Sequence, residues 1–372
     1  YYIIQRSVYM STDINVAINN KKLTIDFLVP CGGRGGVENV LNDTALYLKS
    51  LGIRVRVIQL VYNDYSWPDS SLEYYTINID RAISDFSDYV PMCEQYLCEL
   101  GAPDIIIATP LPMLTMIIKL ALLNNHMNSK IISWLHGPLK VYDDNAYGGL
   151  ECLKYADLVM VLSHSSYQYI KKNNPTINVV LVKNPIDFSS LIYHTNYKPE
   201  CRTLAFIGRL SKEKNVDIII NAIAHTKLPW KLIIIGDGDE ADSLKKLTIT
   251  LNIKERISFL GWKDTPWTYI SDISSLILSS SYEGFPLVCL EALANGIPVL
   301  STAVNGVTDI IKQGYNGYIY SDLDELISLL DSPDTFKDIL PSNCHNSVLL
   351  YDKPLALKEL SDYILSVISN KI

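Results

Sequence analysis

The chain has 372 residues, of which 48% are hydrophobic and 19% are charged. At roughly 100–200 residues per domain this length predicts two domains, and the apolar content excludes a disordered chain. The chain has a net charge of −8 and so lacks the excess of basic residues typical of nucleic-acid-binding proteins, and no nucleic-acid partner is expected. The seven cysteines are scattered without a C-x-x-C pair, which favours free thiols over disulfides or zinc in a cytoplasmic protein.

The start of the sequence carries no recognisable cleavable signal, and Met10 is an alternative native start. The most hydrophobic stretch, residues 105–123, is interrupted by prolines and a lysine, so a strand and a helix are expected there rather than a membrane span. Peripheral association with the inner face of the cell membrane stays open, through a local patch such as Lys171 and Lys172.

Strands and helices are predicted to alternate along the first half. An apolar run at residues 24–30 ends at a glycine cluster, and a helical pattern follows at residues 37–51. Further strands are predicted at residues 55–61, 104–108, 130–135 and 158–162. Strands joined by helices in this way form parallel sheets that are covered on both faces.

A second series follows a polar stretch at residues 187–199. Its predicted strands are residues 203–207, 231–235, 256–260, 275–278 and 298–301, and its predicted helices are residues 217–226, 240–251 and 287–294. The predicted fold class is therefore α/β, with two Rossmann-like doubly wound parallel-sheet domains facing a cleft, because ligands of such sheets bind at the carboxyl ends of the strands. We place the domains at residues 1–187 and 188–353, and expect a C-terminal helix at residues 354–372 that returns to the first domain.

Two glycine-containing loops are candidates for binding phosphate. The loop from Gly32 to Glu38 offers backbone N–H groups at a helix start, which suits a phosphate or a sugar, although such a loop is often only a tight turn. NAD is disfavoured, because residues 59–62 lack the acid that would hold its ribose. In the second half, Arg209 and Lys214 follow a strand and can clamp a diphosphate, the alternative being a solvated turn.

The two aspartates of the Gly236-Asp-Gly-Asp239 segment are a weaker candidate. They form a D-x-D pattern that can bind a metal, but a simple turn is the preferred interpretation.

The most informative segment is residues 281–299. Pro286 is predicted at the first position of a helix, Glu283 just before it and Glu291 within it. Eight residues make a little over two turns, so both carboxylates can face one side of the helix. The free N–H groups at residues 285–288 lie between them and form an anion site.

These motifs resemble those of glycosyltransferase family 4, the retaining enzymes of the two-Rossmann GT-B class. The matching motifs are G-G-V-E at residues 35–38, G-R-L-x-x-E-K at 208–214, G-D-G at 236–238 and E-x₇-E at 283–291. Within the family, residues 260–262, 265–267 and 280–286 are most similar to those of lipopolysaccharide core 1,6-galactosyltransferases.

The resemblance implies a role for each matching residue. Arg209 and Lys214 would bind the diphosphate of the donor, and Glu291 the ribose. Glu283 would hold hydroxyls of the transferred sugar, and His136 would contact that sugar near the reacting carbon. Without the resemblance, His136 reads as a structural histidine at a strand end. The other implied donor contacts are Gly35, Gly36, Gly208, Gly236, Gly284, Phe285, Pro286 and Leu287.

Two positions depart from the family pattern. The usual N-G-V-D reads Asn184-Pro-Ile-Asp187 here, and Asn215 replaces a glycine after the clamp lysine. Neither change removes a charged group, but the first leaves open whether the backbone near the donor has the conformation usual in the family.

The activity that the resemblance implies is the transfer of a hexose, with galactose as first choice, from a UDP-sugar to a lipopolysaccharide core or related glycan acceptor. The anomeric configuration would be retained, without a metal or another cofactor. Alternatives are an acceptor that is a lipid-linked capsular polysaccharide or exopolysaccharide intermediate, a UDP-sugar 2-epimerase, and a sensor that binds sugar nucleotides without catalysis.

Overall fold

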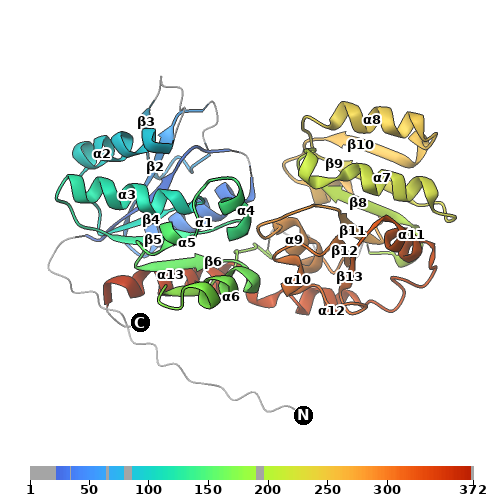
Figure 1. Ribbon diagram of the computed structural model, residues 1–372. Coiled ribbons are helices and arrows are strands. Elements are labelled where there is room, and N and C mark those ends of the chain that lie inside the picture. Colours follow the sequence, from blue (N-terminus) through green and yellow to red (C-terminus); the bar gives the residue numbers. More distant parts are fainter. Residues whose placement is uncertain (1–21, 34, 64–66, 79–85, 190–196, 370–372) are drawn as a thin grey trace, which may run out of the picture.

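The computed structural model describes residues 22–33, 35–63, 67–78, 86–189 and 197–369, so Met10 and its neighbours lie outside the described residues. Two lobes stand side by side, each built on a parallel sheet (Figure 1). The first sheet has seven strands in the order β3-β2-β1-β4-β5-β6-β7, and the second has six in the order β10-β9-β8-β11-β12-β13. Six strands of each sheet therefore follow the same order, which confirms the predicted pair of doubly wound sheets.

The strands are β1 (Thr24–Val29), β2 (Arg54–Val61), β3 (Glu73–Asn78), β4 (Ile105–Ala108), β5 (Lys130–Trp134), β6 (Leu158–Val161), β7 (Val179–Leu181), β8 (Thr203–Ile207), β9 (Lys231–Ile235), β10 (Ile257–Gly261), β11 (Ser275–Leu278), β12 (Val299–Thr302) and β13 (Gly317–Tyr320). The α-helices of the first lobe are α1 (Gly36–Ser50), α2 (Tyr89–Leu100), α3 (Pro112–Asn124), α4 (Leu139–Asp144), α5 (Leu150–Leu153) and α6 (His164–Asn173). Those that follow are α7 (Val216–His225), α8 (Ala241–Thr250), α9 (Leu287–Ala294), α10 (Val307–Ile310), α11 (Leu323–Asp331), α12 (Pro341–Asn346) and α13 (Lys353–Ser369).

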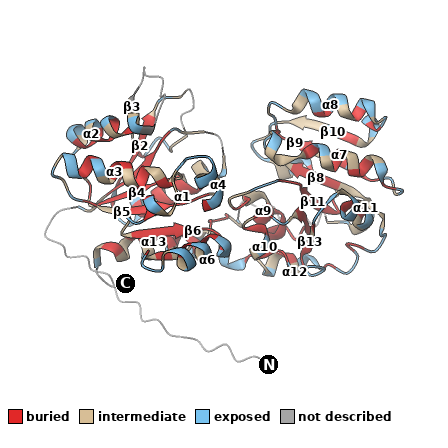
Figure 2. Cartoon of the chain, in the orientation of Figure 1, coloured by how far each residue is buried: buried red, intermediate tan, exposed pale blue. Residues whose placement is uncertain are grey.

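Both faces of the sheets are buried beneath helices (Figure 2). In β1, Phe27 packs in the core with Leu41 of α1, and the adjacent Leu28 packs on the other face with Leu97 of α2; all of these side chains are 0–1% exposed. A strand buried on both faces is apolar throughout, which is why the short apolar runs identified these strands.

The predicted strands lie within two residues of the observed ones, but three strands were missed. β3 (EYYTIN) carries polar residues at the edge of the first sheet, β7 has only three residues, and β13 begins at a glycine. Such strands lack the long apolar run of a central strand, so the hydrophobic pattern alone did not distinguish them from loops.

Helix α13 packs against α1 and β5 of the first lobe, although it follows the second lobe in sequence (Figure 1). The Lys353 ammonium lies 2.7 Å from the Asp43 carboxylate of α1, and the Glu359 carboxylate of α13 lies 2.8 Å from Lys183. Leu360 and Ile364 are buried. Across the described stretches of the chain, no helix is both long and apolar enough to span a bilayer.

Candidate active site

A cleft of about 980 Å³ lies where the carboxyl ends of the two sheets face each other. The first lobe lines it with the segments that follow β1, β2, β5, β6 and β7, and the second lobe with those that follow β8, β9, β10 and β11. Every site residue predicted from the sequence lines this cleft, namely Gly35, Gly36, His136, Gly208, Arg209, Lys214, Gly236, Glu283, Gly284, Phe285, Pro286, Leu287 and Glu291.

Two glycines allow the lobes to approach each other closely. A Cβ added to Gly284 would overlap the carbonyl oxygen of His136, and one added to Gly36 would lie 2.8 Å from Cδ1 of Leu287. The loop before α9 therefore lies directly against the segment after β5. Any side chain at Gly284 would have to displace backbone of the opposite lobe.

The lysine of the predicted clamp is paired with a carboxylate. Nζ of Lys214 donates to Oε1 of Glu283 at 2.6 Å, and the Ser280 hydroxyl donates to the same oxygen at 2.6 Å. The two charged side chains are 20% and 11% exposed. An ammonium carries three N–H groups, so Lys214 can bind an anion while it holds Glu283.

Arg209 is exposed at the end of β8 and lines the same cleft. In the part of the chain that the structure describes, its guanidinium forms no ion pair. The adjacent β-strand ends are held close by glycine: Gly236 has φ +149°, and a Cβ there would overlap the carbonyl oxygen of Gly208. Arg209 and the carboxylate-bound Lys214 therefore both lie beside a tightly packed turn.

Glu291 lies on α9, where its Oε2 accepts a 2.8 Å hydrogen bond from the indole Nε1 of Trp267. Burial raises the pKa of this carboxyl, and the indole hydrogen bond opposes that rise. The prediction that Pro286 occupies the first helical position is wrong: it is the extended N-cap residue, and α9 begins at Leu287. Because proline has no N–H, the first donor of this helix comes from Leu287.

His136 is 8% exposed, and burial lowers its pKa to about 3, so its imidazole is neutral. Its ring lies 4.7 Å from that of Trp134. Its Nε2 atom has no hydrogen-bond partner among the described residues. Buried polar atoms in proteins are normally paired, so an unpaired nitrogen at a cleft wall is available to a ligand.

The two departures from the family pattern have different structural consequences. Asn215 adopts the left-handed conformation at φ +46°, which explains why the family pattern has a glycine here. The Asn215 side chain donates to the Ser279 carbonyl at 3.1 Å. Asn184 is 3% exposed and lines the cleft, and its Oδ1 has no partner within the described residues. The altered segment thus keeps an unpaired acceptor at the cleft.

Sequence reasoning did not assign several cleft residues to the site. They include Glu38, Trp67, Asn184 and Trp262, while Trp267 stands directly behind Glu291. The motifs already contained Glu38, Asn184 and both later tryptophans, but nothing in their spacing indicated which side chains face the cleft.

The candidate metal pair lies elsewhere. Asp237 and Asp239 are exposed and are not among the residues that line the cleft, and Oδ1 of Asp237 accepts from the Gly238 amide at 2.8 Å. Within the described residues, no three histidine, cysteine, aspartate or glutamate side chains lie close enough together to hold a metal ion.

Two doubly wound lobes that face a polar cleft define a protein of the GT-B class. Among solved structures, the fold matches the lipopolysaccharide outer core galactosyltransferase WaaB with a TM-score of 0.76 at 24% identity, over 94% of this chain and 100% of that one. It also matches Anabaena HepE in complex with UDP-glucose, with a TM-score of 0.73 at 18% identity and the same coverage.

Residues 194–331 match the model of the family Glycosyl transferases group 1. The lipopolysaccharide 1,6-galactosyltransferase of Salmonella typhimurium is 31% identical over 199 residues, which is 51% of this chain but only 54% of that protein. The Escherichia coli K12 enzyme of the same name is 28% identical over 315 residues, 80% of this chain and 85% of that protein. The second lobe therefore carries the domain of the group 1 glycosyl transferases, and the chain is a glycosyltransferase.

Proposed function

We propose that this glycosyltransferase transfers galactose from UDP-galactose to a lipopolysaccharide core or related cell-surface glycan, with retention of the anomeric configuration. The observation that carries the proposal is the position of Arg209, Lys214, the start of α9 and the carboxylates Glu283 and Glu291 around one cleft. The choice of galactose and lipopolysaccharide is supported by the names of the two relatives that are 31% and 28% identical.

In the proposed reaction the second lobe binds the donor. Arg209, Lys214 and the amides at the start of α9 stabilise the negative charge that develops on the departing diphosphate. Since Lys214 also holds Glu283, the same cation links the diphosphate to the carboxylate that binds sugar hydroxyls. The ribose is assigned to Glu291.

The first lobe is proposed to carry the acceptor side of the reaction. The acceptor hydroxyl attacks the anomeric carbon on the face from which UDP leaves, and its proton passes to the leaving phosphate oxygen. Neutral His136 lacks the acidic second proton of an imidazolium, so it is not proposed as a general acid, and its proposed role is a hydrogen bond to the transferred sugar. The proposed reaction uses no metal and takes place in the cytoplasm, at the inner face of the cell membrane.

A donor panel tests this proposal. UDP release is measured from UDP-galactose, UDP-glucose and UDP-N-acetylglucosamine, with and without a truncated lipopolysaccharide acceptor. We expect acceptor-dependent release that is fastest with UDP-galactose and is unchanged by EDTA. Conversion of a UDP-sugar to its epimer without acceptor would instead establish an epimerase, and loss of activity in EDTA with rescue by Mn²⁺ would overturn metal independence.

A further inference from the structure

The carboxylate assigned to the ribose, that of Glu291, is hydrogen-bonded to a second side chain of the same lobe. Glu291 lines the cleft, but its Oε2 is occupied by the indole N–H of Trp267, 24 residues earlier in the sequence, at 2.8 Å. Trp267 is partly buried against the core of the lobe and is not one of the residues that line the cleft. It therefore contacts the carboxylate from the protein side rather than from the cleft.

We propose that Trp267 is a positioning residue that holds Glu291 in the orientation required to bind the ribose of the donor. This inference rests on the proposed function, since it assumes that the donor is a UDP-sugar. With Oε2 engaged by the indole, Oε1 is the oxygen left for a ligand, because no other hydrogen bond to the Glu291 side chain occurs within the described residues.

Three features of the surroundings support this role. First, the Glu291 side chain is half-buried, and the burial of its carboxyl raises its pKa. A buried carboxylate is costly unless a donor satisfies it, and an indole N–H is a donor only. Removal of that donor therefore leaves Glu291 free to rotate or to take up a proton.

Second, Trp267 belongs to the short turn η5 (Pro266–Tyr269) that follows β10. The segment leading into this turn supplies Trp262, Lys263 and Asp264 to the cleft wall. The indole hydrogen bond thus ties this wall to α9.

Third, the geometry fits a positioning role better than a packing role. A hydrogen bond of 2.8 Å from the indole N–H to a carboxyl oxygen is short and directional, so it fixes the plane of the carboxyl group as well as its place. Apolar packing alone would hold the indole ring but would not orient Glu291.

The test replaces the indole N–H with as little other change as possible. UDP binding is measured by calorimetry for wild type, Trp267→Phe, Glu291→Gln and the double variant, and is repeated with 2′,3′-dideoxy-UDP, which lacks both ribose hydroxyls. We expect Trp267→Phe to weaken UDP binding about tenfold, the size of one hydrogen bond to a charged group. The double variant should be little weaker than Glu291→Gln, and dideoxy-UDP should bind wild type and Trp267→Phe alike.

Kinetics provide a second readout. Ribose binding is the same before and during the reaction, so Trp267→Phe should raise KM for the donor and leave kcat nearly unchanged. A matched control is Trp230→Phe, which removes the indole N–H that donates to the Leu330 carbonyl at 2.6 Å in the core, away from the cleft. That variant should lose stability but not UDP affinity.

The outcomes separate this inference from the proposed function. If wild type binds UDP and Trp267→Phe binds it equally well, the positioning role is overturned and the donor assignment stands. If Trp267→Phe weakens UDP and dideoxy-UDP to the same degree, the tryptophan supports the fold rather than Glu291, and the role is again overturned. If wild type binds no UDP, the donor assignment fails and this inference with it.

Discussion

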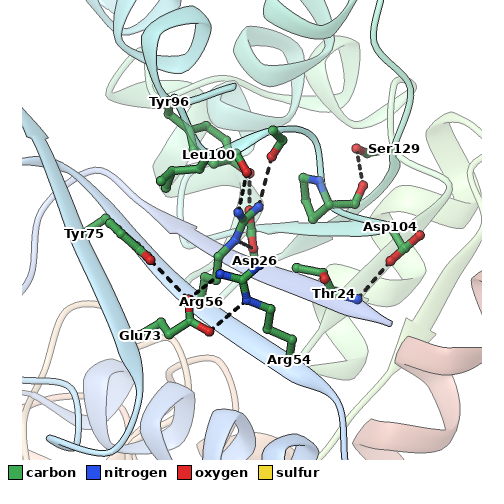
Figure 3. Close-up of polar contacts among 12 residues, drawn as sticks. Thr24, Asp26, Arg54, Arg56, Glu73, Tyr75, Tyr96, Leu100, Asp104 and Ser129 are labelled. Carbon is green, nitrogen blue, oxygen red and sulfur yellow. Dashed lines mark hydrogen bonds and ion pairs between the residues drawn. The ribbon is translucent and has the colours of Figure 1, made fainter. Parts of the chain in front are cut away.

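The Asp26–Arg56 pair of the first lobe and the Lys214–Glu283 pair of the second differ in how completely their hydrogen bonds are satisfied. Figure 3 shows Arg56 between Asp26 and the end of α2. Its guanidinium donates to both Asp26 oxygens at 2.7 and 2.6 Å and to the carbonyls of Leu100 and Gly101, and the Tyr96 hydroxyl donates to Asp26 as well.

The first-lobe pair is closed to a ligand, because it is buried and four hydrogen bonds to protein acceptors engage the guanidinium. Its side chains are 3% and 0% exposed, and Asp26 lies near the start of β1, at the end of the sheet away from the cleft. By contrast, Lys214 lies beyond the carboxyl end of β8, is 20% exposed and has donors to spare. A buried pair whose hydrogen bonds are made within the protein stabilises the fold, whereas a pair at a cleft with donors to spare can also bind a ligand.

The largest expected effect is on the buried pair. Replacing Arg56 with Met leaves the Asp26 charge buried without its partner, which should lower the free energy of unfolding by about 3–5 kcal/mol. Urea denaturation measures the loss. UDP affinity of the folded variant should not change, and a loss below about 1 kcal/mol would contradict a structural role for the pair.

The approach of the lobes provides the next test. Gly284→Ala places a methyl group where the His136 carbonyl oxygen lies, so the cleft must open. A displacement of about 1 Å at a reacting centre costs on the order of 10²-fold, which is the expected loss in kcat/KM. Gly314→Ala is the control: its φ of +70° should make the variant less stable, but its Cβ would meet nothing closer than 3.6 Å and it is not among the cleft-lining residues, so kcat/KM of the folded variant should be unchanged.

The pair at the cleft is tested by removing its cation. Lys214→Ala and Arg209→Ala should each weaken UDP-sugar binding by about 1.5–3 kcal/mol, because each removes a charged hydrogen-bond donor from the diphosphate. Calorimetry with UDP measures the change. Lys212→Ala, on the same turn but not part of the cleft lining, should bind UDP as wild type does. Equal affinities for all four proteins would refute the clamp.

Neutral His136 predicts how stability depends on pH. Its pKa falls from an ordinary 6.5 to about 3 on folding, so below pH 6.5 the unfolded chain binds a proton that the native protein excludes. This residue stabilises the fold above pH 6.5, and its contribution falls by up to about 1.4 kcal/mol per pH unit between pH 6.5 and 3. We expect His136→Asn to remove this part of the dependence of the unfolding free energy on pH, measured by urea denaturation at several pH values. The same dependence in wild type and variant would show that His136 takes up a proton in the folded protein as readily as in the unfolded chain.

The smallest effect is expected at an exposed pair in the same region as Asp26. Arg54 and Glu73 lie 2.7 Å apart, but their side chains are 45% and 39% exposed (Figure 3). Arg54→Ala should therefore cost only about 0.2–1 kcal/mol in urea denaturation, since water solvates both charges after the change. A loss as large as that of Arg56→Met would mean that burial does not decide the strength of these pairs.

Much of the fold was predictable because its signals are local. The central strands are continuous apolar runs, and glycine or a cap residue marks the adjoining turns, so β8, β9, β11 and α9 lie where the sequence placed them. The edge strand β3 and the short β7 and β13 were not predictable, because their few residues carry too little hydrophobic pattern.

The sequence alone located the motif residues at this cleft, since their segments follow strands at the carboxyl edges of the sheets, but it did not show that Trp67 or Asn184 also line it. How these side chains are paired became visible only in the packed structure. Lys214 meets Glu283 across 69 residues, Trp267 meets Glu291 across 24, and Gly284 meets His136 from the opposite lobe. Such contacts depend on how two sheets are packed and how two lobes approach, and no local pattern of residues encodes those distances.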